Sequence, residues 1–107
     1  AFARVLGYYV RDRRILTLEQ AIRKMSSQSA KRLGIQDRGL IATGFFADIA
    51  IFDPDKIKDK ATFENPHQYA VGMKHVLVNG EIVVLDGKHT GNRPGKIIHG
   101  PGWKPML

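Results

Sequence analysis

The chain has 107 residues, 43% of them hydrophobic and 25% charged, which is close to ordinary globular usage and sets one domain as the natural ceiling. The absence of cysteine excludes disulfides and thiolate metal sites. It fits the reducing cytoplasm, where we expect the protein, but it equally fits many exported proteins. No apolar run approaches the ~20 residues that span a bilayer, and no signal pattern opens the chain, so we expect no membrane partner.

The first residues predict an amphipathic helix. Apolar side chains recur there at helical spacing, at Phe2, Val5, Leu6, Tyr9 and Val10. Neither an initiator methionine nor a capping residue precedes them, whereas helix termini usually carry caps. We therefore expect the sequence to be a piece of a longer polypeptide.

Two further helices are predicted before residue 35. Thr17 and Gln20 have the spacing of a capping box, and the apolar positions that follow are Leu18, Ala21, Ile22 and Met25. Ser26 or Ser27 can cap a third, shorter helix with Ala30 and Leu33 pointing inward, and Gly34 offers a left-handed end.

Beyond Gly34 the apolar period approaches 2, so strands are predicted, with a domain boundary near Ile35. The expected strands are a short one at Leu40–Ile41, a buried one at Ala47–Phe52, and a hairpin of Met73–Val78 with Glu81–Leu85 across Asn79–Gly80. Asp86–Gly87 offers a second tight turn. Pro54–Gly72 is a long polar connection, and Gly91–Leu107 is rich in Pro and Gly, so extended chain is expected there.

Several motifs occur in an order that resembles the carboxyl end of amidohydrolase-superfamily enzymes. They are Leu16–Met25, Ala30–Ile35, Asp37–Ile41 and Gly44–Pro54. The resemblance is greatest to the D-aminoacylase group, or N-acyl-D-amino-acid deacylases, because Ala61–His67, Val78–Gly80 and Asp86–Gly95 also fit that group. It covers roughly Phe2 to Ile98, nearly the whole chain.

The resemblance implies an α+β fragment of a larger enzyme. Residues 1–34 would be closing helices of a metal-dependent (β/α)8 barrel, residues 35–98 the carboxyl-terminal part of a small β-sandwich, and residues 99–107 a Pro/Gly-rich tail. The remaining barrel and sandwich strands would be partners of this piece, which should therefore expose unpaired strand edges. The parent would be a zinc hydrolase that cleaves N-acyl-D-amino acids to a carboxylate and a free D-amino acid.

No catalytic or metal-binding residue is expected within this chain, and the substrate-binding residues stay unknown. The family's His-x-His pair is absent, and the four histidines, His67, His75, His89 and His99, match no metal-ligand spacing and are expected on the surface or in loops. Asp48 and Asp53 flank an apolar strand and are expected to bond backbone amides. Such a piece is predicted to be inactive alone and to bind no zinc itself.

Two alternatives stay open. One is the tail of a cyclic-amide hydrolase of the dihydropyrimidinase kind, which shares the Ala47–Asp53 motif. The other is a free-standing basic module that binds nucleic acid, since the net charge is +7. Against a nucleic-acid partner, the basic residues are scattered and the aromatic ones do not alternate with them. Trp103 in the tail is either a docking anchor or terminal sequence.

Overall fold

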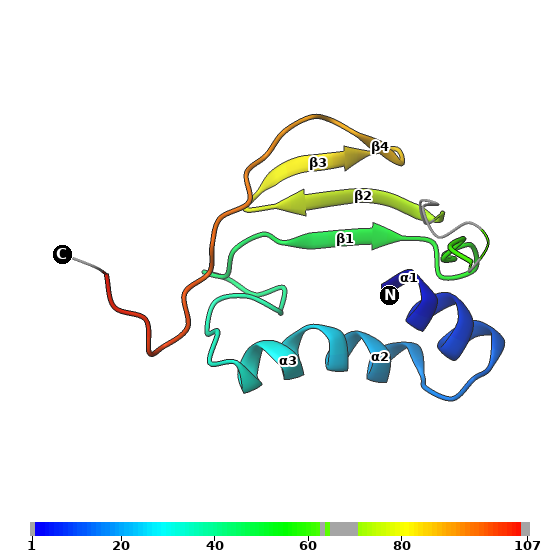
Figure 1. The fold of residues 1–107 in the computed structure, drawn as a ribbon, viewed down its shortest axis with the longest axis horizontal. Helices are drawn as coiled ribbons and strands as arrows, with labels where there is room; N and C mark the ends of the chain where they lie inside the picture. Colours follow the sequence, from blue (N-terminus) through cyan, green and yellow to red (C-terminus); the bar gives the residue numbers. More distant parts are fainter. Residues whose placement is uncertain (1, 63, 65–70, 106–107) are drawn as a thin grey trace.

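The computed structural model describes residues 2–62, 64 and 71–105, and it consists of a helical layer beside an antiparallel sheet (Figure 1). The helical elements are α1 (Phe2–Arg4), η1 (Val5–Asp12), α2 (Leu18–Met25) and α3 (Ser27–Arg32). The strands are β1 (Ile49–Phe52), β2 (Met73–Val78), β3 (Glu81–Leu85) and β4 (Lys88–His89). The predicted α+β character is confirmed.

The first helix differs from the expectation in its winding. After α1 the chain continues as the π-helix η1, whose end is marked by the Arg13 N–H donating to the Tyr8 carbonyl at 2.8 Å. The wider turn changes which side chains share a face. Leu6 is buried as predicted, but Phe2 and Tyr9 are 51% and 40% exposed, and Ala3 lies in the core instead.

The capping box that begins α2 is confirmed. The Gln20 N–H donates to the Thr17 hydroxyl at 3.2 Å, and the Thr17 N–H donates to the Gln20 side-chain oxygen at 3.0 Å. Ala21 is fully buried. Each of the two side chains accepts an N–H that would otherwise be unpaired. Two residues were therefore enough to predict where the helix starts.

The predictions for α3 are partly wrong. Ser26 occupies the position before the helix, but its hydroxyl donates back to the Ile22 carbonyl rather than capping α3. Leu33 is 65% exposed rather than inward, and it lies just beyond α3, which ends at Arg32. Gly34 does take the left-handed conformation, with φ of 74°.

The sheet has the strand order β1-β2-β3-β4 with every neighbour antiparallel. The predicted hairpin is present, and Asn79 and Gly80 have φ of 49° and 79°, as a primed turn requires. Asp86 and Gly87 repeat that pattern before β4. Among the described strands β1 and β4 are the edges.

Two strand predictions are wrong. Leu40 and Ile41 form no strand, and they are 57% and 85% exposed in a loop of bends and turns. The strand expected at Ala47–Phe52 begins only at Ile49, and its Ile51 is 45% exposed rather than buried. In both places apolar residues lie on surface that no described element covers, so their hydrophobicity did not report burial within this chain.

The core joins the two layers at one end of the molecule. It consists of Ala3, Leu6, Ala21 and Ile57, and Phe52 and Met73 of the sheet pack against it. Ile57 belongs to the connection that follows β1, so a loop residue holds the helices to the sheet. Residues 90–105 contain no helix or strand, as the composition predicted, whereas most of the Ala61–His67 motif lies outside the described residues.

Candidate functional site

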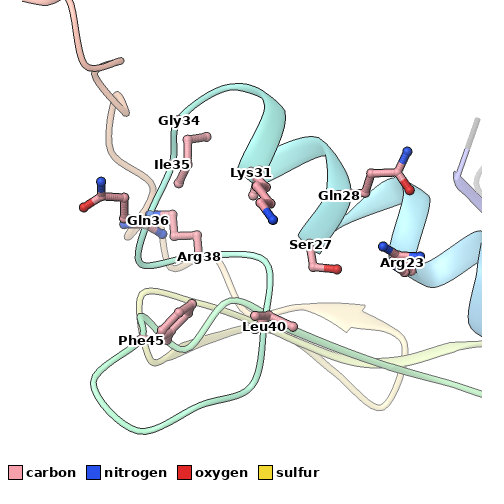
Figure 2. A pocket seen from close by; sticks show the side chains of 11 residues that line it. Arg23, Ser27, Gln28, Lys31, Gly34, Ile35, Gln36, Arg38, Leu40 and Phe45 are labelled. Carbon is pink, nitrogen blue, oxygen red and sulfur yellow. The ribbon is translucent and has the colours of Figure 1, made fainter.

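An open groove of about 570 Å³ lies between the α2–α3 helices and the loop that follows them (Figure 2). The helices contribute Arg23 from α2 and Ser27 and Lys31 from α3. The loop contributes Arg38, Leu40 and Phe45. The groove thus has a cationic wall and a partly apolar wall.

The groove carries positive charge that nothing in its lining balances. Three lining residues are cationic and none is a carboxylate. Of the three, Arg38 is engaged by neighbours, whereas Arg23 and Lys31 make no ion pair within the described part of the chain. Such a groove can attract an anionic group, but it offers neither an acid–base pair nor a metal ligand.

Arg38 is the centre of a polar network. Its guanidinium pairs with the Asp48 carboxylate, donates to the Asn79 side-chain oxygen at 2.7 Å, and lies 4.2 Å from the centre of the Phe46 ring. The Asn79 side-chain amide donates in turn to the Pro94 carbonyl at 2.7 Å. The network ties the loop before β1, the hairpin turn and the tail together.

Asp48 has the structural role expected of it. One carboxylate oxygen accepts the Asn79 N–H at 2.8 Å and the other accepts from Arg38. Partial burial by itself would raise the pKa of Asp48, but the Asn79 N–H and the Arg38 guanidinium outweigh it and hold the pKa below its usual value. Asp53 also behaves as predicted, because it accepts the Asp55 N–H at 2.9 Å in a turn.

A second hollow, of about 320 Å³, lies beside the Asp86–Gly87 turn. His75 of β2 accepts the Asp86 N–H on Nδ1 at 3.2 Å, and its Nε2 is 3.8 Å from an Asp86 carboxylate oxygen. Asp53 lines the same hollow. These contacts fasten the turn to β2. His75 itself lies in that strand and not in a loop.

Zinc does not fit the described residues. Across residues 2–62, 64 and 71–105, no three His, Asp or Glu side chains come together as a metal site would need. His89 is exposed on β4, and His99 stacks on Trp103 with ring centres 3.7 Å apart. His67 lies outside the described residues.

Two arginines of the first helix hold the connection after β1. Arg11 donates to the Ile57 carbonyl at 2.9 Å, and Arg4 pairs with Asp59 at 3.2 Å and donates to the Ala61 carbonyl at 2.8 Å. These roles and that of Arg38 were not predicted from the sequence. No local signal could have found them, because each partner lies ten to 57 residues away.

Comparison with known proteins finds the model of the amidohydrolase family over residues 1–84. The N-acyl-D-glutamate deacylase of Alcaligenes xylosoxydans xylosoxydans is 44% identical over 98 residues, which are 92% of this chain and 20% of the relative. A crystal structure of D-aminoacylase has 42% identity and a TM-score of 0.82, covering 86% of this chain and 19% of that one.

A third relative is the N-acyl-D-glutamate deacylase of Bordetella bronchiseptica, whose structure contains zinc and a phosphonate inhibitor. It has 43% identity and a TM-score of 0.75 over 81% of this chain and 19% of that one. A weaker match is the dihydroorotase of Lactobacillus acidophilus, 30% identical over 81% of this chain and 23% of the relative. The chain spans about a fifth of the length of the relatives it matches.

Proposed function

The chain belongs to the amidohydrolase family, and from that premise we propose that it is the carboxyl-terminal part of an N-acyl-D-amino-acid deacylase. The parent reaction would be hydrolysis of the linear amide of an N-acyl-D-amino acid to a carboxylate and a free D-amino acid. The observation that carries the proposal is 44% identity to a deacylase over 92% of this chain.

The proposed role of this part is architectural. Residues 1–34 would be closing helices of the (β/α)8 barrel, residues 35–98 the carboxyl-terminal strands of a small β-sandwich, and residues 99–107 a tail. Exposed apolar residues on the sheet and its neighbouring loop support this, because Ile41, Phe46, Ile51 and Ile82 would gain cover from the remaining strands. None of the helices in the described part is long and apolar enough to cross a membrane. A cytoplasmic location is part of the proposal, supported by the absence of cysteine.

Zinc would belong to the parent enzyme, and its ligands would lie outside this chain. Support comes from the zinc in the Bordetella bronchiseptica relative and from the lack of a suitable cluster among the described residues. The catalytic residues would likewise lie outside it. The 107 residues alone should then be inactive.

Cyclic-amide hydrolysis is the second candidate, since a dihydroorotase also matches. It is the weaker one, because the identity is 30% against 44% for the deacylase. A nucleic-acid-binding module is not favoured, since the family match accounts for most of the chain.

The test is activity of the natural polypeptide against that of this chain. First, an antibody to residues 44–53 should detect a band several times larger than 12.0 kDa in source cells. That polypeptide, purified with zinc, should hydrolyse N-acetyl-D-amino acids, spare the L-enantiomers and cyclic amides, and lose activity on chelation. The isolated chain should hydrolyse none of them. Activity of the isolated chain, or a natural band at 12.0 kDa, would overturn the proposal.

A further inference from the structure

The groove between the α2–α3 helices and the 34–45 loop has no part in the proposed reaction. Its helical wall presents Arg23 and Lys31, and Gln28 lies beside them. Figure 2 shows Lys31 and Ser27 on the side of the helices that faces the loop, with Leu40 and Phe45 across from them.

We propose that this groove is the docking site for an acidic segment supplied by the remainder of the longer polypeptide, with carboxylates against Arg23 and Lys31 and an apolar side chain against Leu40. The inference rests on the proposed function in one respect, because it requires the chain to be part of a longer polypeptide. It adds the chemistry of the docking segment and the residues of this chain that bind it.

Charge carries the first step of the inference. The chain has a net charge of +7, and the groove gathers cations without a carboxylate in its lining. Arg23 and Lys31 find no ion-pair partner among the residues that the structure describes. Opposite charges near a partly covered surface attract more strongly than in bulk water, so a carboxylate is the group this wall favours.

Apolar exposure carries the second step. Leu40 is 57% exposed although it lines the groove, and Phe45 beside it is only half-buried. Covering Leu40 removes apolar surface from water, which favours a segment with an apolar side chain between its acids. A nucleic acid fits less well, because Phe45 does not stand free as a stacking platform and Arg38 is already engaged.

Length carries the third step. The chain spans 20% of the matched deacylase, so about four fifths of such a polypeptide would be available to supply the segment. A segment of the same polypeptide is held at high effective concentration, so two or three modest contacts suffice to seat it. A separate acidic protein would need a larger contact area than this groove alone offers.

The first test is site-specific photo-crosslinking in the natural full-length polypeptide. A benzophenone amino acid replaces Gln28 in the groove, and in the control it replaces Lys24, which lines no part of the groove. Mass spectrometry should find the probe at position 28 joined to an acidic segment outside residues 1–107, and the control should not reach that segment. Crosslinks from position 28 only within residues 1–107, to a segment without carboxylates, to another protein or to nucleic acid would overturn the proposal.

A second measurement uses two matched double variants of the same polypeptide. R23Q/K31Q removes two positive charges from the groove, whereas K24Q/R32Q removes two from adjacent positions in the same helical turns. The groove variant should melt a few degrees lower than the control at low salt, and the difference should shrink at about 0.5 M salt because exposed charges are then screened. Equal melting temperatures for the two variants would overturn the proposal.

Failure here and failure of the proposed function are distinguishable. Crosslinking and melting require no substrate and no metal, so they report docking in a polypeptide of any activity. A longer polypeptide that lacks deacylase activity but gives the acidic crosslink would refute the reaction and keep the groove assignment. A deacylase whose crosslinks reach only an uncharged segment would keep the proposed reaction and refute the groove assignment.

Discussion

The backbone of Gly7 lies directly against the carbonyl group of Ile57, so closely that a Cβ at position 7 would overlap the carbonyl oxygen. Ile57 is fully buried, and Gly72 approaches its backbone from another side. The connection after β1 is thus held between the first helix and the start of β2. Small residues at both positions are what let the helical layer touch the sheet.

Replacing Gly7 with Ala should destabilise the chain by about 1–3 kcal/mol, because the added methyl group forces the helix away from Ile57. Alanine favours helices by roughly 1 kcal/mol over glycine, so the overlap must outweigh that gain. Urea unfolding followed by circular dichroism measures the difference. Gly95→Ala is the control, since no atom lies within 4 Å of its added Cβ. If both variants unfold at the same urea concentration, the close contact does not contribute to stability.

Ile57→Ala should lower the free energy of unfolding by about 2–5 kcal/mol, the range for emptying a buried aliphatic site. The loss should be large because Ile57 is one of the four buried hydrophobic residues that form the core in the described part of the chain. Ile41→Ala is the matched control, since Ile41 is 85% exposed and its loss should cost about 0.5 kcal/mol or less. A similar loss for both variants would place the stabilising core elsewhere.

Asn79 serves the hairpin in two ways, and two substitutions separate them. Asn79→Gly keeps a residue that tolerates φ of 49° but removes the side-chain contacts to Arg38 and the Pro94 carbonyl. Asn79→Ala removes the same contacts and adds backbone strain. The Ala variant should therefore be less stable than the Gly variant by about 1 kcal/mol in urea unfolding. Equal stability would mean that the turn conformation contributes little.

Asp48 should make stability depend on acid pH. The Asn79 N–H and the Arg38 guanidinium hold its pKa in the folded chain below its usual value against the opposing effect of partial burial, so the folded state favours the ionised carboxylate. This contribution is fully present above the unfolded pKa and is lost as the pH falls through the folded pKa. Unfolding measured from pH 6 down to about pH 2 should lose stability less steeply in Asp48→Asn than in the parent sequence. Asp59, whose pKa is also lowered, should maintain part of the slope in that variant. Identical slopes would contradict the role of the Arg38–Asp48 pair.

Thr17→Ala should cost about 1 kcal/mol, because it leaves the Gln20 N–H without its capping oxygen. Thr17→Ser restores a hydroxyl and should recover most of the loss. Thr43→Ala, at an exposed position in the loop before β1, is the control and should unfold like the parent. The helical signal at 222 nm during urea unfolding reports all three. Full stability of Thr17→Ala would show that α2 does not need its capping box.

Local chemistry made several elements readable in advance. Thr17 and Gln20 marked the start of α2, and Asn79–Gly80 marked the hairpin turn. Gly34 marked the left-handed residue that follows α3. Each depends on a bond or a backbone angle set by residues at most three positions apart. For the same reason Asp53 could be assigned to a turn amide. The order of such motifs also carried the family resemblance, which the family match over residues 1–84 confirms.

Burial and long-range contacts were decided only by the tertiary structure. The apolar spacing of the first residues did not reveal a π-helix or the exposure of Tyr9, and the apolar pair Leu40–Ile41 formed no strand. Arg38, Arg4 and Gly7 gained their roles from partners ten to 57 residues away, whose approach depends on how the loops fold back. Hydrophobicity states that a residue favours burial, but only the surrounding elements determine whether a surface is there to bury it.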